Sequence, residues 1–161
     1  MARIIIADAG PLIAFASIDA LAALQKLFSE INIAESVKCE CLAKAGADSQ
    51  RIAAAIDEGW LVTFTPGDAS EPLSPSLGAG ESDSIRFALQ SPADSLLIID
   101  DRLARRFALK QGINIVGTVR ILDLAEQRGL IRSAKQSIAE MTTIGYRVSM
   151  ELLKQIRLES S

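Results

Sequence analysis

Residues 3–13, which read Arg-Ile-Ile-Ile-Ala-Asp-Ala-Gly-Pro-Leu-Ile, decide the fold of this chain. The isoleucine run is short and β-branched, which predicts a strand buried on both faces, as in a parallel sheet. Asp8 ends the strand, and the Gly-Pro pair that follows favours the first turn of a helix. Residues 94–99 repeat the strand signature and run into Asp100 and Asp101.

Strand-like and helix-like segments alternate along the rest of the chain. Strands are predicted at residues 3–7, 31–34, 60–64, 94–99 and 113–116. Helices are predicted from Pro11, from about Asp19 to 28, from a Ser36 cap to Ala45, and over 49–58, 81–89, 102–111, 119–128, 133–144 and 149–158. This alternation predicts the α/β class, as a three-layer α/β/α sandwich with a mostly parallel central sheet.

The length of 161 residues suits one domain with a single core, and we expect that domain to span residues 1–161. The loop at 65–78 holds three of the five prolines and is too short to link two domains. Helices at about 133–158 are expected as an extension packed on the domain. Their apolar side chains suit core packing or, alternatively, a surface for a partner.

The composition excludes several kinds of chemistry and compartment. The chain has no histidine, so an imidazole base, an imidazole metal ligand and a Ser-His-Asp triad are all excluded. Cys39 and Cys41 are the only cysteines; their spacing does not favour a disulfide, and we expect two small, buried, reduced side chains. No apolar run approaches the roughly 20 residues of a membrane span. The chain starts directly with a strand-like segment, so we expect a cytoplasmic protein without membrane contact.

The net charge of −3 gives no overall attraction to nucleic acid. Three arginines nevertheless follow the acidic pair at 100–101. A solvated helix face is the default interpretation for Arg102, Arg105 and Arg106. Because Arg102 and Arg106 are four residues apart, they share one helix face, which suits contact with RNA phosphates.

Acidic side chains stand where predicted strands end or predicted helices begin: Asp8, Glu40, Glu81 and the pair Asp100–Asp101. In an open parallel sheet, sites form beyond the carboxyl ends of the strands, where these acids are expected to meet. Clustered carboxylates repel one another, and a divalent cation relieves that repulsion. Mg²⁺ or Mn²⁺ suits all-oxygen ligands and promotes phosphodiester chemistry by activating a water. The acid set therefore predicts a cation site.

Each acid also has a purely structural interpretation. Asp8 and Asp101 stand where helix caps occur, and Glu81 in a first turn suits the helix dipole. The set is more specific than its members, because one topology explains all of them together. Asp83 is a weaker candidate that points elsewhere on its helix, and Asp94 stands at the opposite end of its strand.

The segments that carry these acids resemble, in order, the motifs of PIN-domain proteins. The resemblance covers about residues 3–130 and is closest to a bacterial and archaeal subgroup with a Gly-Glu third motif. The matching segments are Asp8-Ala-Gly-Pro-Leu-Ile13, Val37-Lys-Cys-Glu40, Leu77-Gly-Ala-Gly-Glu81, Leu97-Ile-Ile-Asp-Asp-Arg102 and Gly112-Ile-Asn-Ile-Val-Gly-Thr118. The resemblance implies a Mg²⁺- or Mn²⁺-dependent ribonuclease. Many such proteins are toxins of toxin–antitoxin pairs, often dimeric and held inactive by a small antitoxin.

The resemblance also implies roles for individual residues. The positions that it makes metal ligands and catalytic acids are Asp8, Glu40, Glu81 and Asp101. Asp100 is adjacent to Asp101 and remains an alternative for the fourth ligand. The chain departs from the family pattern twice: Glu81 opens a helix where an aspartate within a helix is common, and Ile99 stands where many members have a hydroxyl residue.

Three functions are therefore compared. The leading hypothesis is a metal-dependent endoribonuclease, the toxin of a toxin–antitoxin pair, acting on RNA as a homodimer. The second is a PIN-like module that binds RNA or protein without catalysis, which Ile99 and the modest basic content favour. The third is a phosphatase with Asp8 as nucleophile. It is disfavoured because no Asp-x-Asp motif follows the first strand.

Overall fold

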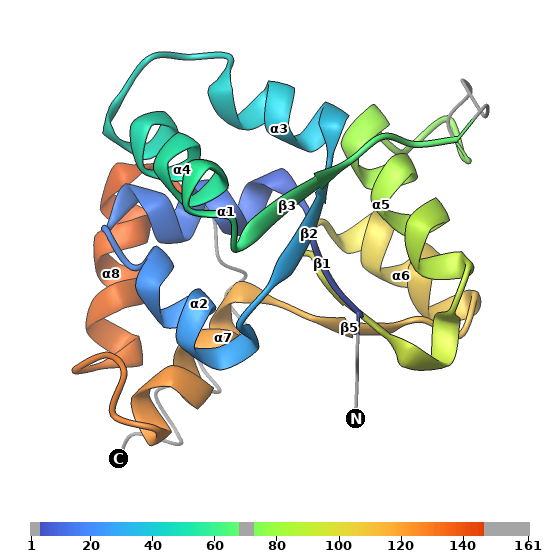
Figure 1. Cartoon of the computed structure of the whole chain (residues 1–161). Helices are drawn as coiled ribbons and strands as arrows, with labels where there is room; N and C mark the ends of the chain where they lie inside the picture. Colours follow the sequence, from blue (N-terminus) through green and yellow to red (C-terminus); the bar gives the residue numbers. More distant parts are fainter. Residues whose placement is uncertain (1–3, 68–72, 147–161) are drawn as a thin grey trace.

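The computed structural model describes residues 4–67 and 73–146, and within these ranges the chain forms a five-stranded sheet between two layers of helices (Figure 1). The strands are β1 (Ile4–Ala7), β2 (Ile31–Ala34), β3 (Leu61–Phe64), β4 (Ser95–Ile98) and β5 (Asn114–Val116). Their order is β3-β2-β1-β4-β5, and every pairing is parallel. The predicted α/β class and parallel central sheet are confirmed.

The inner strands β1, β2 and β4 are mostly buried, as the apolar runs of their sequences predict, whereas the edge strands β3 and β5 are partly exposed. In β1 the side chain of Ile5 belongs to one hydrophobic cluster, and that of Ile6 belongs to a second cluster on the other face. Leu97 and Ile98 of β4 divide in the same way. This alternation follows from the two-residue period of a strand, because successive side chains point to opposite faces.

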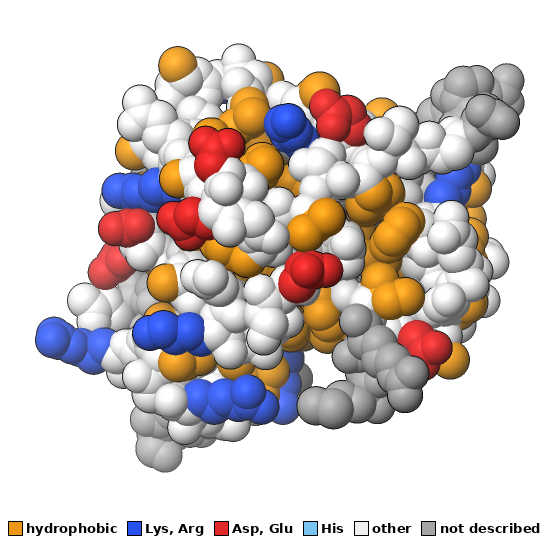
Figure 2. Space-filling model, viewed as in Figure 1, with side chains coloured by type: hydrophobic (Ala, Val, Ile, Leu, Met, Phe, Trp, Pro, Cys, Tyr) orange, Lys and Arg blue, Asp and Glu red, His pale blue; other side chains and the backbone are white. Residues whose placement is uncertain are grey.

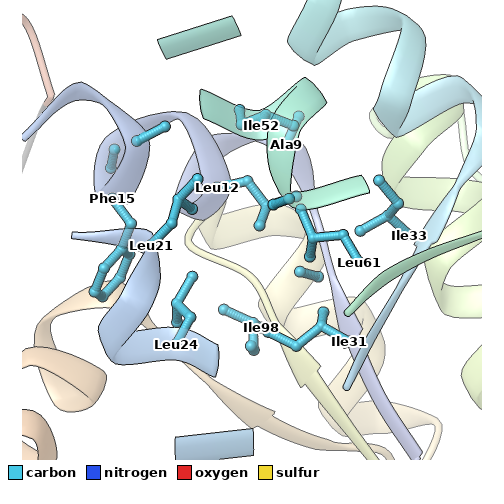
Figure 3. Packing of buried hydrophobic residues seen from close by; sticks show 14 of the residues in the cluster. Ala9, Leu12, Phe15, Leu21, Leu24, Ile31, Ile33, Ile52, Leu61 and Ile98 are labelled. Carbon is cyan, nitrogen blue, oxygen red and sulfur yellow. The ribbon is translucent and has the colours of Figure 1, made fainter. Parts of the chain in front are cut away.

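The two faces of the sheet are covered by different numbers of helices. Their bounds are α1 (Ala9–Ser17), α2 (Leu21–Phe28), α3 (Glu35–Leu42), α4 (Ala47–Glu58), α5 (Ala79–Leu89), α6 (Arg102–Lys110), α7 (Thr118–Gln127) and α8 (Ala134–Ile144). The cluster on one face holds side chains of α5 and α6, and the cluster on the other holds side chains of the remaining helices. Figure 3 shows this larger cluster, which joins Leu12 and Phe15 of α1 and Ile52 of α4 to the sheet residues Ile31 and Leu61.

The register of β1 and β4 decides where the acids lie. These strands are direct neighbours, with Ala7 paired to Ile98. The backbone N–H of Asp8 continues the ladder by donating to the carbonyl of Ile98, at 3.0 Å. Asp8 and the pair that follows Ile99 therefore leave the sheet at the same, carboxyl edge. Figure 1 shows that α3 and the start of α5 also lie at this edge.

Several local expectations were wrong. Ser36 does not cap its helix: α3 begins at Glu35 after Ala34, and the Ser36 hydroxyl donates instead to Asp83 Oδ2, at 2.6 Å. The same helix ends at Leu42, so Ala45 lies outside it. The second helix starts at Leu21 rather than near Asp19, whose φ of 56° is not helical.

The C-terminal half agrees with the sequence as far as it is described. Helix α8 matches the predicted 133–144 segment, with Ile138 and Met141 buried against the core. The predicted helix at 149–158 lies outside the described residues. Both cysteines are free, but only Cys41 is buried, because Cys39 is exposed on α3. No helix in the described ranges is long and apolar enough to cross a membrane.

Candidate functional site

Asp8 lies at the bottom of the acidic edge, the name used here for the carboxyl edge of the sheet with its acids Asp8, Glu40, Glu81, Asp100 and Asp101. It follows β1 directly, and its side chain is only 8% exposed. Asp8 occupies the N-cap position of α1, but within the described residues its carboxylate forms no capping bond, and its Oδ1 has no hydrogen-bond partner. The capping interpretation of Asp8 is therefore wrong. A buried carboxylate oxygen without a partner is costly unless something else binds it.

Glu40 and Glu81 reach the same place from two packed helices. Helix α5 approaches α3 closely at Gly80, where an added Cβ would lie 3.1 Å from Val37 Cγ2. The same point is 3.5 Å from Asp8 Oδ1 and 3.6 Å from Glu40 Oε2. The glycine thus leaves room between the two acids. Glu81 follows in the first turn of α5, and its Oε2 is buried with no hydrogen-bond partner among the described residues.

The two aspartates after β4 differ in their surroundings. Asp101 is exposed and is the N-cap of α6, where its Oδ2 accepts from the backbone N–H of Ala104 at 2.9 Å. Its capping interpretation is therefore confirmed. Asp100 turns toward β5 and α7 and accepts two bonds from Thr118, from the N–H at 2.8 Å and from the hydroxyl at 2.5 Å.

The carboxylates influence one another's ionisation. Burial raises the pKa of Asp8 to about 7, and the negative charges of Glu81, Glu40 and Asp100 add to the rise, whereas a bond from the Ala9 N–H opposes it. Burial also raises the pKa of Glu81, and the charge of Asp101 is the next largest cause. The acids singled out in the sequence, Asp8, Glu40, Glu81, Asp100 and Asp101, thus form one electrostatic group.

The donor set fits a hard divalent cation, although the side chains do not already enclose one. Asp8 Oδ1 and Glu81 Oε2 are buried oxygens without a hydrogen-bond partner among the described residues, and Glu40 Oε2 and Asp8 Oδ1 both lie within 4 Å of the Cβ position at Gly80. All-oxygen ligands of this kind suit Mg²⁺ or Mn²⁺. Among the described residues, however, no three acid or thiol side chains stand together as a ready ligand group.

Arg105 departs from its expected role on a solvated helix face. It is half-buried, and its Nη1 donates to the carbonyl of Ile99 at 2.8 Å. Arg102 and Arg106 are exposed, as predicted. Asp83 serves the packing of α5, since it accepts from Ser36 and lies 3.9 Å from Arg86.

Two residues at this edge were not identified as site residues from the sequence. Thr118 is the first residue of the helix after β5. A search for hydroxyl side chains at the ends of the predicted strands, as well as for acids, would therefore have identified it. The Thr118 hydroxyl donates a hydrogen bond to Asp100. Ile99, at the position where the sequence comparison expects a hydroxyl residue, is instead fully buried in the core beneath α5 and α6. Tyr146 lies just beyond α8, where burial raises the pKa of its hydroxyl and the negative charge of Asp100 is the next largest cause. No local sequence signal indicates that Tyr146 lies near this edge.

Charged side chains of both signs share the molecular surface. On the face shown in Figure 2, several Lys and Arg side chains gather toward the lower left, and most Asp and Glu side chains lie above them. This mixture agrees with a net charge of only −3. Any attraction to a polyanion must therefore come from a local group of cations rather than from the general field.

Comparisons with known proteins agree with the fold of this chain. A family model described as a PIN domain matches residues 4–160. A solved structure of a PilT N-terminus domain protein, from the hyperthermophilic archaeon Sulfolobus solfataricus P2, is similar with a TM-score of 0.54 and 17% identity. The similarity covers 76% of this chain and 93% of that chain. No curated protein matches the chain.

Proposed function

Because this chain belongs to the PIN-domain family, we propose that it is a metal-dependent endoribonuclease that hydrolyses RNA phosphodiester bonds. PIN domains are generally nucleases, and those nucleases typically use divalent metals. The single observation that carries the proposal is the pair of buried carboxylate oxygens without partners, Asp8 Oδ1 and Glu81 Oε2, at the carboxyl edge of the sheet. A stable fold retains such atoms at a cost, which a bound cation would offset.

The acids differ in how deeply they lie. Asp8 and the buried Oε2 of Glu81 would hold the cation from inside, and the exposed Glu40 and Asp101 would complete the ligand set and orient the attacking water. Asp100, held by Thr118, contributes its negative charge from the side. A bound Mg²⁺ or Mn²⁺ would supply an activated water and neutralise charge on the phosphodiester. The sequence left one or two ions open, and both numbers suit this set.

Helix α6 offers the local cations that RNA binding needs. Its exposed arginines, Arg102 and Arg106, begin immediately after Asp101. They stand one turn apart on the same helix face, so successive phosphates of a strand entering the acidic edge can contact them. Such contacts position a backbone without reading its sequence.

A cleavage assay tests the proposal. Purified protein with a mixed-sequence RNA and Mn²⁺ is expected to cut the RNA, and excess chelator is expected to stop it. Asp8→Asn and Glu81→Gln are expected to lower the rate at least 100-fold, on the order of the effect of losing a group essential to the transition state. Asp94→Asn, at the opposite end of β4, is the matched control and should cut at the wild-type rate. No cleavage by the wild type, or equal cleavage by Asp8→Asn, would refute the proposal.

We further propose that the enzyme is the toxin of a toxin–antitoxin pair, acting in the cytoplasm as a homodimer and inhibited by a small protein. The support is the resemblance of its motifs to that class. Induced expression in a bacterial host should arrest growth, and Asp8→Asn should not. A small reading frame beside the gene, whose product restores growth, would be the expected antitoxin; normal growth on wild-type expression argues against a toxin.

The binding module without catalysis remains the second candidate. The observation in its favour is that, in the described ranges, no three acid or thiol side chains stand ready to hold an ion. For this function, RNA or protein binding would persist in chelator, and calorimetry would detect no Mn²⁺ binding at micromolar concentration. Micromolar Mn²⁺ binding that is lost in Glu40→Gln would exclude it.

A further inference from the structure

Helices α3 and α5, which carry Glu40 and Glu81, pack against each other at the acidic edge. On α3, Ser36 and Glu40 are four residues apart and therefore share one face of the helix. On α5, Gly80 and Asp83 are three residues apart and share a face in the same way. A Cβ added at Gly80 would lie 3.6 Å from Glu40 Oε2, and Asp83 accepts a hydrogen bond from Ser36. The two helices thus meet at the proposed ligand Glu40 and again one turn earlier.

The earlier contact is a hydrogen bond between two side chains. The Ser36 hydroxyl donates to Asp83 Oδ2 at 2.6 Å, a length typical of a hydroxyl that donates to a carboxylate. Only 12% of the Asp83 side chain is exposed, and its Oδ1 lies 3.9 Å from Arg86 Nη1. Because the bond is largely shielded from water, it holds the two helices together more firmly than an exposed bond would.

Helix α3 has no local device that fixes its first turn. It has eight residues, and a helix of that length is not stable by itself in water. Its N-cap residue is Ala34, and no side-chain capping bond forms there. Ser36, whose hydroxyl could bond the local backbone, bonds Asp83 of α5 instead. The start of α3 is therefore held by α5 rather than by a cap of its own.

We propose that Ser36 and Asp83 are positioning residues of the cation site, whose hydrogen bond sets α3 against α5 so that Glu40 stays near Asp8. The proposal rests on the cation site of the proposed function and adds to it two residues that do not touch the cation. Glu40 stands one turn beyond Ser36 on the same face, so a shift of α3 along α5 moves the Glu40 carboxylate with it. Groups that orient metal ligands typically change metal affinity by about 10- to 100-fold when they are removed.

Ser36→Ala removes the donor and leaves every acid in place. In the full-length protein, calorimetric titration is expected to show Mn²⁺ binding about 10-fold weaker than in wild type. Ser17→Ala is the matched control, because it removes a hydroxyl at the last residue of α1 that donates to the carbonyl of Ala14. It should bind Mn²⁺ as the wild type does. Equal Mn²⁺ affinity of Ser36→Ala and wild type would overturn the proposal and leave the cation site intact. Absence of Mn²⁺ binding by the wild type would instead remove the cation site, and this proposal with it.

Asp83→Asn separates a positioning role from a ligand role. The amide oxygen of asparagine can accept the same hydrogen bond from Ser36. Mn²⁺ affinity is therefore expected to stay within about threefold of wild type, because the screened charge of a group that is not a ligand adds little. Asp83→Ala, which has no acceptor, should lose about 10-fold in affinity, as Ser36→Ala does. A loss in Asp83→Asn as large as that in Asp83→Ala would show that the site needs the charge of Asp83 and would overturn the proposal.

Combining two substitutions tests whether the residues act through one bond. The double variant Ser36→Ala, Asp83→Ala should bind Mn²⁺ no more weakly than the weaker of the two single variants, because either substitution alone already removes the bond. Additive losses would mean that the serine and the aspartate act by separate routes, which would overturn the proposal.

Hydrogen exchange in chelator observes α3 directly and guards against a general loss of stability. In Ser36→Ala, the backbone amides of α3 are expected to exchange faster than in wild type, whereas those of β1 should stay as protected as before. Faster exchange throughout the sheet would mean that the variant is destabilised as a whole and would overturn the positioning role. Unchanged exchange in α3 together with weaker Mn²⁺ binding would overturn it too, because the serine would then act without moving the helix.

Discussion

At the residue scale, Asp8 has an environment that opposes its charge. It is nearly buried, its Oδ1 has no partner among the described residues, and three other acids act on it. Asp101, only one strand away, is exposed and capped onto a helix. Identical side chains at similar strand ends thus have different environments. The sequence predicts the position of both aspartates in the chain. It does not predict that Asp8 is buried and Asp101 exposed, because that difference depends on how α3 and α5 pack over the edge.

The raised pKa of Asp8 predicts how stability depends on pH. The unfolded carboxyl releases its proton near 3.8, whereas the folded one retains it to about 7. Between these values the folded state binds more protons, so the free energy of unfolding falls as pH rises, by up to about 4 kcal/mol from this group. Asp8→Asn, which has no charge to bury, should therefore be more stable than wild type at pH 8 in chelator.

Urea unfolding at pH 5 and pH 8, in chelator, checks this expectation. The stability difference between the two pH values should be smaller in Asp8→Asn than in wild type, with the remainder coming in part from Glu81, whose pKa is raised in the same direction. An Asp8→Asn protein that is less stable than wild type at pH 8 would show that the Asp8 carboxylate is not strained.

At the scale of elements, the strands were the most predictable part. Short β-branched runs buried on both faces admit few alternatives, and 31–34 is reproduced to the residue as β2. Helix α3 was less predictable, because Ser36 is an ordinary capping residue by type but bonds Asp83 across to α5. A tertiary partner therefore replaced the local cap. The close α3–α5 approach at Gly80 likewise has no local signature beyond the glycine itself.

Two glycines in equivalent helical positions test that approach. Gly10 and Gly80 are each the second residue of a helix, α1 and α5. A Cβ at Gly10 meets nothing within 4 Å, so Gly10→Ala should stabilise the protein by up to about 1 kcal/mol. A Cβ at Gly80 would press on Val37 and stand between Asp8 and Glu40. Gly80→Ala should therefore lose that gain and weaken Mn²⁺ binding several-fold.

Chemical unfolding and calorimetry on the two variants provide the check. If Gly80→Ala were as stabilising as Gly10→Ala and bound Mn²⁺ like the wild type, the space at Gly80 would have no role in the site.

At the scale of the whole molecule, strand order is what turns separate acids into a site. The sequence predicts acids at strand ends, but only the adjacency of β1 and β4 places Asp8 beside the Asp100–Asp101 pair. The chain also returns toward this edge after α8, where the negative charge of Asp100 helps to raise the pKa of Tyr146. This placement depends on the packing of α8 against α1 and α7, which no local pattern specifies. We therefore propose that α8 belongs to the same domain as the sheet.

Unfolding of α8 variants tests this single-domain proposal. Met141 is fully buried in the core cluster, so Met141→Ala should lower the free energy of unfolding by about 2–5 kcal/mol in one cooperative transition. Ile144→Ala, on the same helix but 60% exposed, should change it by less than about 0.5 kcal/mol. A separate early transition confined to α8 would show instead that the helix is an independent appendage.

The central claim is that the acids at the carboxyl edge of the sheet bind a divalent cation, and anomalous diffraction from crystals grown with Mn²⁺ tests it most directly. The account predicts an anomalous peak at Asp8 and Glu81, with Glu40 and Asp101 completing the ligands, and no such peak in crystals of Asp8→Asn. A fully occupied Mn²⁺ peak elsewhere, or none at this edge at millimolar Mn²⁺, would contradict it.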